Sequence, residues 1–302
     1  MANTLTNLNF TILAQKALEA FVSAMVPITA FASNFGEGEV QRGDKVKVAF
    51  VDAASAAQLF VAAAGYQIQD SQASGLDISI NRRVYVSWGL TTQELANNPQ
   101  LTLERFARQK GFQLAKFALQ DIWSVVTQAN YGNAIWSGTP DMFNSDDVAD
   151  IEAAVDESLW PATDRALILR PTYHSAVTKD AKIAGTIGLQ ESAVLQRSQV
   201  PMVHNFNLHK SPFVPANPDA QLRGMVVHPD AILIASRVLV PEDPSKIIRF
   251  ERLADPMGSG LTCAFREWTD PVLDQTNRVL EFTYGFLPGN KTGLRRIVAA
   301  GQ

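Results

Sequence analysis

The sequence predicts an α+β fold built around one long helix, and two patterns carry this prediction. Between Thr102 and Ala129, apolar residues recur every three to four positions, as they do on the buried face of an α-helix. Segments in which apolar and polar residues alternate, as in β-strands, occur both before and after that helix. A helix of this length spans roughly 40 Å, near or beyond the width of a small domain. We therefore expect a strut rather than one helix of a bundle.

The predicted helix carries two apolar stripes, although a surface helix needs only one. The first stripe comprises Leu103, Phe106, Ala107, Leu114, Phe117, Ala118, Ile122, Val125 and Ala129, and the second comprises Phe112, Leu119, Trp123 and Val126. We expect C-terminal strands to cover one stripe, and an arm or a neighbouring subunit to cover the other. An acidic residue at Phe117 is then expected to damage the fold, and Gly111 to mark a close backbone approach or a bend.

Composition narrows the classes of function. The chain has 302 residues, a net charge of -4 and one cysteine, Cys263. A tight nucleic-acid binder would carry an excess of basic residues, and the negative net charge excludes such an excess. A single cysteine excludes an intramolecular disulfide and a cysteine-based zinc cluster, and it fits a reducing cytoplasm. Because no run approaches the ~18 apolar residues of a membrane span and no basic region precedes an apolar one at the N-terminus, we expect neither membrane insertion nor export by the usual signal.

The segments before the long helix predict a tail, a short helix and a long ribbon. Met1 to Phe10 is polar and reads as a loose arm, and Thr11 to Met25 has the spacing of an amphipathic helix that Pro27 stops. Lys45 to Val51 and Asp77 to Trp88 alternate, and we expect them to form one antiparallel ribbon. Between them, Ala53 to Gln69 carries no charge. We interpret this stretch as an extended arm over a neighbouring subunit; the alternative is a small helical insert on the same chain.

The segments after the long helix predict a compact α/β domain followed by strands. A helix from Ser145 to Ser158 and a buried strand from Ala166 to Leu169 precede a helix that begins at Pro171. The order strand, proline and helix repeats through Gly224 to Val238. The last strands are expected at Ile247 to Leu253, Leu261 to Thr269 and Arg278 to Phe286, with Gly293 to Ala299 as a final edge strand.

The sequence offers no set of catalytic, cofactor-binding or metal-binding residues. A glycine-rich phosphate loop, a Gly-x-Ser-x-Gly elbow and a His-Glu-x-x-His zinc motif are absent. His204 and His209 are five residues apart, so a straight strand would point them to opposite faces. His174 has no carboxylate partner that its spacing identifies. We therefore expect no enzymatic activity, no cofactor and no metal.

Two remaining reactive features have simpler structural explanations. The carboxylates Asp146, Asp147 and Asp150 lie in the first turns of a predicted helix, where negative charge favours the helix dipole. Cys263 lies in a predicted strand between Leu261 and Phe265, as a small buried apolar residue would.

Several stretches, in this order, resemble a known family. They are GDKVKVAFVD, the long helix before NYGN, DRALILRPTYHSAV, VPMVHNFNLHKSPFVP, GMVVHPDAILIAS and VLEFTYGFLPG. Together they resemble the major capsid protein of tailed bacteriophages, the fold first seen in a Hong Kong coliphage. The resemblance implies five regions: an N-terminal arm (1–35), an extended loop (36–89), a peripheral domain with its spine helix (90–140), an axial domain (141–240) and peripheral-domain strands (241–302).

The resemblance implies a structural function. Copies of the chain would form hexamers and pentamers of an icosahedral virion shell that encloses double-stranded DNA without binding it tightly, assembled in the host cytoplasm. The expected partners are a separate scaffolding protein, a portal and a decoration protein. The scaffolding protein is expected to be separate because Met1 to Phe35 leaves no room for a scaffolding region. Val51 to Arg83 contains no lysine, so we expect no isopeptide crosslink there. The expected inter-subunit contacts are Ala56, Leu59, Phe60, Val61, Tyr66, Ile68, Arg82, Arg83, Arg105, Arg108 and Lys116.

Two other interpretations stay open. An encapsulin-like nanocompartment would keep the fold but enclose an enzyme cargo. A cytoplasmic α/β enzyme with an unrecognised site would form a small closed oligomer rather than a shell.

Overall fold

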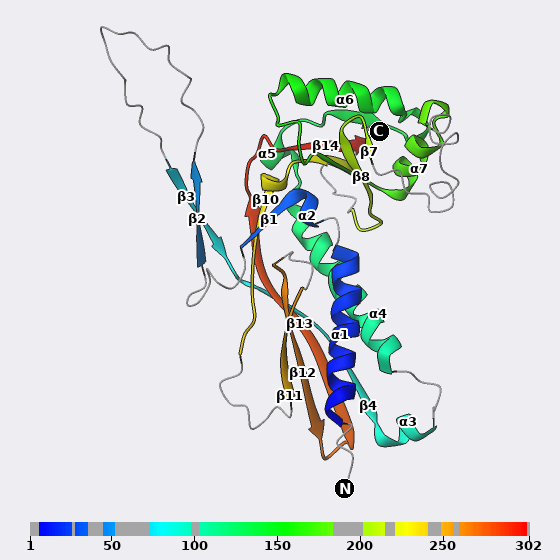
Figure 1. The fold of residues 1–302 in the computed structure, drawn as a ribbon, viewed down its shortest axis with the longest axis vertical. Helices are drawn as coiled ribbons and strands as arrows, with labels where there is room; N and C mark the ends of the chain where they lie inside the picture. Colours follow the sequence, from blue (N-terminus) through cyan, green and yellow to red (C-terminus); the bar gives the residue numbers. More distant parts are fainter. Residues whose placement is uncertain are drawn as a thin grey trace.

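The protein is elongated, with a compact unit at one end and a β-ribbon that projects from its side (Figure 1). The computed structural model describes residues 6–25, 28–35, 45–51, 73–97, 103–183, 202–214, 221–240, 249–255 and 260–300. Within these residues the strands form two six-stranded sheets and one two-stranded ribbon.

The first sheet, here called the long sheet, is organised by β13 (Gln275–Pro288). One edge of β13 pairs antiparallel with β12 (Thr262–Asp270) and then with β10 (Ile232–Arg237), and its other edge pairs with β4 (Arg82–Thr91). Beyond these, β11 (Arg249–Ala254) pairs with β12 and β1 (Ala32–Phe35) pairs parallel with β10. Segments from both ends of the chain therefore meet in one sheet.

Two long helices, α1 (Thr6–Met25) and α4 (Leu103–Ile122), pack together beside the long sheet (Figure 1). Their apolar faces share one core with that sheet. In this core the ring centres of Phe21 and Phe282 lie 5.2 Å apart. The helices cross at Gly111, where an added Cβ would overlap the carbonyl oxygen of Ala17. The close backbone approach expected at this glycine is confirmed.

Short helical elements join the longer ones along the chain. The helix α2 (Ile28–Phe31) lies between α1 and β1, and α3 (Thr92–Asn97) lies between β4 and α4. The 3₁₀ turn Trp123–Val125 directly follows α4 and precedes α5 (Gln128–Tyr131). The Tyr131 hydroxyl donates to the Ala231 carbonyl at 2.8 Å and so ties the end of this segment to the long sheet.

The second sheet, here called the compact sheet, has the order β5-β14-β9-β6-β8-β7. These strands are β5 (Trp136–Gly138), β14 (Leu294–Ala299), β9 (Leu222–Val227), β6 (Ala166–Leu169), β8 (Phe206–Lys210) and β7 (Met202–Val203). Two helices, α6 (Ser145–Glu157) and α7 (Pro171–Lys179), bury their apolar faces against it. The side chain of Asn144 caps α6, and Asp147 completes a capping box, as carboxylates at a helix start favour.

The ribbon consists of β2 (Lys45–Val51) and β3 (Ala73–Ser79), paired antiparallel from Lys45 opposite Ser79 to Val51 opposite Ala73. The predicted ribbon is therefore present. Its second strand differs from the prediction, because the chain turns at Ile80 and Asn81, and the residues that follow pair with β13 as β4.

Two boundaries and one packing partner predicted for the N-terminus and the long helix are wrong. Residues 6 to 10 belong to α1 rather than to a loose tail, because Phe10 is buried against Phe265. The long helix ends at Ile122, since the backbone tightens into a 3₁₀ turn there, so α4 spans about 30 Å. The second apolar stripe meets the chain's own first helices at Trp123, which packs on Phe31, whereas Phe112 of the same stripe stays 46% exposed.

Two assignments in the second half are also wrong. Residues 231 to 238 were expected to be helical, but Ile232–Arg237 is the buried strand β10 between β1 and β13. A fully buried apolar run fits a strand and a helix equally well, so periodicity alone does not separate them. The last strand is not an edge: β14 lies between β5 and β9 in the compact sheet.

Candidate assembly surface

The ribbon is the most protruding feature of the molecule, and its base packs across β10 and β13 of the long sheet (Figure 1). Its inward side chains and those of β10 form a small apolar cluster: Val46, Val48, Ile78, Ile80, Leu233 and Ala235. At Gly285 an added Cβ would overlap the backbone of Ser79. Only a residue without a side chain permits this approach of the ribbon to the sheet.

A polar anchor fixes the point where the ribbon ends and β4 begins. Arg82 donates to Asp121 at the end of α4 with a nitrogen–oxygen distance of 2.9 Å. The Tyr284 hydroxyl on β13 donates to the other oxygen of the same carboxylate at 2.7 Å. Burial, followed by the bond to Asp121, raises the pKa of Tyr284 above its ordinary value, so this phenol stays a donor. The guanidinium of Arg82 also lies 4.7 Å from the ring centre of Phe286.

Arg83, one residue further along, compensates a buried charge. Its guanidinium donates to Glu281 at 2.7 Å, and Arg266 approaches the same carboxylate at 3.4 Å. The side chain of Glu281 is only 4% exposed, whereas that of Arg83 is 52% exposed. The hydrogen bond to Glu281 raises the pKa of Arg83. Since a buried carboxylate without a partner is costly, Arg83 serves the subunit's own stability while still facing solvent.

The basic residues predicted on the long helix lie on its exposed side. Arg105, Arg108 and Lys116 are exposed, and they follow each other at a spacing of three and eight residues along α4. Phe112 lies in the same row, 46% exposed, with its ring edge against Phe213. We call these four residues the basic stripe.

The prediction for Phe117 is wrong. Its side chain is 54% exposed, although the periodicity assigned it to the buried stripe. Leu114, three residues earlier, and Ala118, the next residue, take the buried positions, because α1 and the long sheet meet α4 along that line. An exposed phenylalanine beside Lys116 is available to another molecule.

The remaining predicted contacts, Ala56, Leu59, Phe60, Val61, Tyr66 and Ile68, lie outside the described residues. The arm interpretation of Ala53 to Gln69 lies outside them as well, so both stay predictions. The assignment of Arg82, Arg83, Arg105, Arg108 and Lys116 to subunit contacts is also still a prediction; the structure gives their exposure and their partners within one chain.

The side chains considered for chemistry are buried or take part in contacts within the chain. His174 is buried, and burial, with the charge of Lys210 as a lesser cause, lowers its pKa. His204 lies in the turn between β7 and β8, and its Nε2 is 3.0 Å from the hydroxyl oxygen of Ser145. Cys263 is buried as predicted, and burial raises the pKa of its thiol. Among the described residues, no three His, Cys, Asp or Glu side chains are grouped so that they could hold a metal.

Comparisons with known proteins identify a fold without a sequence family. No protein-family profile matches this chain, and no curated protein matches it. The capsid structure of the cyanophage P-SCSP1u matches with a TM-score of 0.61 at 14% identity, over 90% of this chain and 87% of that chain. The mature capsid of bacteriophage PhiM1 matches with a TM-score of 0.57 at 10% identity, over 91% and 87% of the two chains.

A third match comes from outside the phages. The virus-like particle from Pyrococcus furiosus has a TM-score of 0.56 at 10% identity, over 95% of this chain and 98% of that chain. The chain thus has the α+β fold of the major capsid proteins of tailed phages, as the resemblance in its sequence implied. Among the described residues, no helix is both long and apolar enough to cross a bilayer.

Proposed function

We propose that this chain is the major capsid protein of a tailed bacteriophage, and that it assembles through hexamers and pentamers into an icosahedral shell around double-stranded DNA. The observation that carries the proposal is the capsid fold, which matches over nine-tenths of the chain in the cyanophage capsid. The projecting ribbon supports it further. A two-stranded ribbon that leaves its own subunit buries little area there, and it is suited to reach a neighbour.

The charge of the chain is compatible with a container for DNA. With a net charge of -4, the interior would not hold the genome by many phosphate contacts, so packaging and release would not meet a large electrostatic barrier. A separate scaffolding protein, a portal and a decoration protein are the partners proposed for assembly in the host cytoplasm.

The direct test is whether the purified chain forms shells. We expect electron microscopy to show closed particles, or size-exclusion chromatography with light scattering to show hexamers and pentamers. A small closed oligomer at all concentrations would contradict the proposal and favour an enzyme. Boiled particles should also run as single subunits in a denaturing gel, because Val51 to Arg83 contains no lysine for a crosslink; covalent ladders would contradict that part.

A deletion variant tests the interpretation of Ala53 to Gln69 as an arm over a neighbouring subunit. Replacing residues 56 to 72 by a short Gly-Ser turn keeps both strands of the β2–β3 ribbon. We expect a folded subunit, judged by circular dichroism, that forms no closed shells. Normal shells from this variant would refute the arm interpretation.

The second candidate is an encapsulin-like nanocompartment, because the likeness to the virus-like particle from Pyrococcus furiosus shows this fold in a shell that is not named as a phage capsid. Particles isolated from cells that express this chain together with its neighbouring genes distinguish the phage capsid from the nanocompartment by their contents. Nuclease-resistant double-stranded DNA would support the phage capsid, whereas a single co-purifying enzyme would support the compartment.

A further inference from the structure

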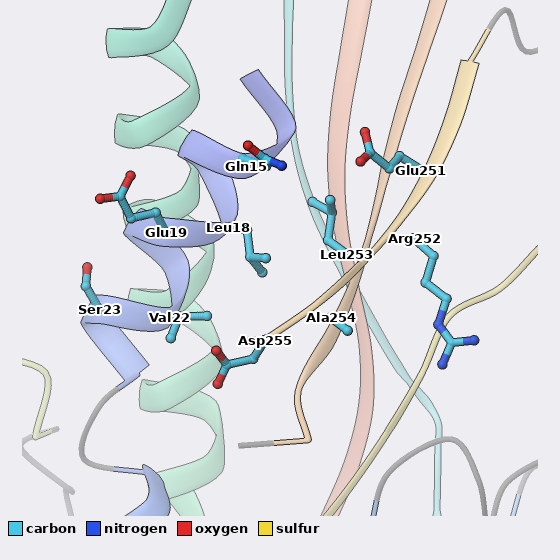
Figure 2. A pocket seen from close by; sticks show the side chains of 10 residues that line it. All are labelled: Gln15, Leu18, Glu19, Val22, Ser23, Glu251, Arg252, Leu253, Ala254 and Asp255. Carbon is cyan, nitrogen blue, oxygen red and sulfur yellow. The ribbon is translucent and has the colours of Figure 1, made fainter. Parts of the chain in front are cut away.

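A groove of about 600 Å³ lies between α1 and β11, on the side of the long sheet that the helices cover (Figure 2). Its apolar surface comes from Leu18 and Val22 on α1 and from Leu253 on β11. On β11 the side chains of Glu251, Leu253 and Asp255 point toward α1, whereas Arg252 points away (Figure 2). The alternation of a strand thus gives the groove an apolar floor with an acidic wall.

Glu251, which lines this groove, carries an unsatisfied hydrogen-bond acceptor. One of its carboxylate oxygens is buried and has no hydrogen-bond partner within the described part of the chain. Burial raises the pKa of this carboxyl, which means that its charged form is disfavoured in the isolated subunit. Buried polar groups are normally satisfied, so an incoming cation or donor at this position would be stabilising. Glu19 also borders the groove, but Lys16 already pairs with it at 2.9 Å.

The matching surface is present on the same chain. The basic stripe presents Arg105, Arg108 and Lys116 around the half-exposed ring of Phe112. This is the complement of an apolar floor with an acidic wall: cations to face the carboxylates and an aromatic ring between them.

The groove and the basic stripe occupy different surface patches of the subunit. The groove lies between α1 and β11, whereas the stripe lies on α4, on the other flank of α1 (Figure 1). The two patches approach each other at α1, because Lys16 and, to a lesser degree, Arg108 lower the pKa of Glu19, which borders the groove. A groove and its complement on different patches generate a head-to-tail contact, which closes into a ring if the rotation between copies permits.

We propose that the α1–β11 groove of one subunit receives the basic stripe of α4 from the next copy of the chain, with Lys116 or Arg108 facing Glu251. This inference rests on the proposed shell function, and it names the partner surface within a ring of subunits. Neither Glu251 nor the groove was among the contacts predicted from the sequence, because β11 and α1 are far apart in the chain.

Site-directed crosslinking between copies tests the contact. One batch carries Glu251→Cys, a second carries Lys116→Cys, and the mixed batches are treated with a short bismaleimide. We expect a crosslinked dimer in this mixture but not with Glu157→Cys, an exposed control on α6. Cys263 does not compete, because it is buried. Equal yields with both partners, or no dimer under conditions where the wild-type chain assembles, would overturn the proposal.

Charge reversal gives an independent measurement. Glu251→Lys alone and the pair Arg108→Glu and Lys116→Glu should each lower the yield of rings or shells, roughly tenfold, because like charges then face each other. All three changes together should restore much of that yield. Circular dichroism establishes that each variant is folded. If the triple variant assembles no better than the single one, the pairing is wrong.

The outcomes separate this inference from the proposed function. A wild-type chain that forms shells without the crosslink leaves the capsid function standing and refutes only the groove contact. A wild-type chain that never assembles refutes both.

Discussion

Replacing Gly111 by alanine tests the contact on which the core of the long sheet depends, the crossing of α1 and α4. A Cβ at this position would overlap the carbonyl oxygen of Ala17 and lie 3.1 Å from its carbonyl carbon. It would also lie 3.3 Å from the backbone nitrogen of Phe21. All three atoms belong to the backbone of α1, so no side-chain rotation relieves the overlap, and the helices must separate.

The expected magnitude follows from two opposing effects. Alanine favours a helix interior over glycine by up to ~1 kcal/mol. Against this, a separation of about 1 Å forfeits a quarter to a half of each dispersion contact along the crossing, and overpacked cores lose about 1–3 kcal/mol. The residues beside the crossing, Ala17, Phe21 and Leu114, are completely buried, so the upper end of that range applies. We expect the free energy of unfolding to fall by about 2 kcal/mol.

Urea unfolding of the dissociated subunit, followed by circular dichroism, measures this change. The matched control is Gln113→Ala, two residues along the same helix at an exposed position, which should stay within about 0.5 kcal/mol of the wild type. If Gly111→Ala is as stable as the wild type or more stable, the gain in helix propensity equals or exceeds the cost of overpacking, and the helices cross less tightly than the structure indicates.

Three further predictions test other parts of the subunit. Phe117→Asp should alter the free energy of unfolding by less than about 0.5 kcal/mol because the side chain is half exposed, whereas Leu114→Asp should unfold the subunit by burying a charge; similar urea curves for the two variants would contradict this. Asp121→Asn weakens the acceptor for Tyr284 and should cost about 1–3 kcal/mol, with faster hydrogen exchange at the start of β4; unchanged exchange there would argue against the anchor. Burial lowers the pKa of His174, so its contribution to stability is present above the unfolded pKa of ~6.5 and is lost as the pH falls below it, by at most about 1.4 kcal/mol per pH unit. His174→Gln should flatten the decline of Tm between pH 6.5 and pH 5, and an unchanged slope would exclude His174 as its source.

Local patterns predicted the elements well where one face is buried and the other is solvated. The alternation in β2 survives as buried Val46 and Val48 against exposed Lys45 and Lys47. The same reasoning failed at Ile232–Arg237, where both faces of the strand are covered and the apolar run carries no period. It failed at Phe117 for a related reason: the period identifies apolar positions, but the neighbouring elements decide which of them are covered.

The candidate site divides in the same way. Exposure of Arg105, Arg108 and Lys116 followed from helical spacing, since charged side chains on a two-striped helix have few positions left. The anchor at Asp121 did not, because its partners Arg82 and Tyr284 are 39 and 163 residues away in the chain. No local signal indicates a contact at such a separation.

The sequence by itself determined the α+β class, the long helix between two sets of strands, the ribbon and the resemblance to capsid proteins, because periodicity and element order are local properties of the chain. Only the tertiary structure decided that the last strand enters the compact sheet, that α1 covers the second face of α4, and that Glu251 faces a groove. Each of these depends on pairing between distant segments, which is set by the burial that the whole chain achieves together rather than by any one stretch of it.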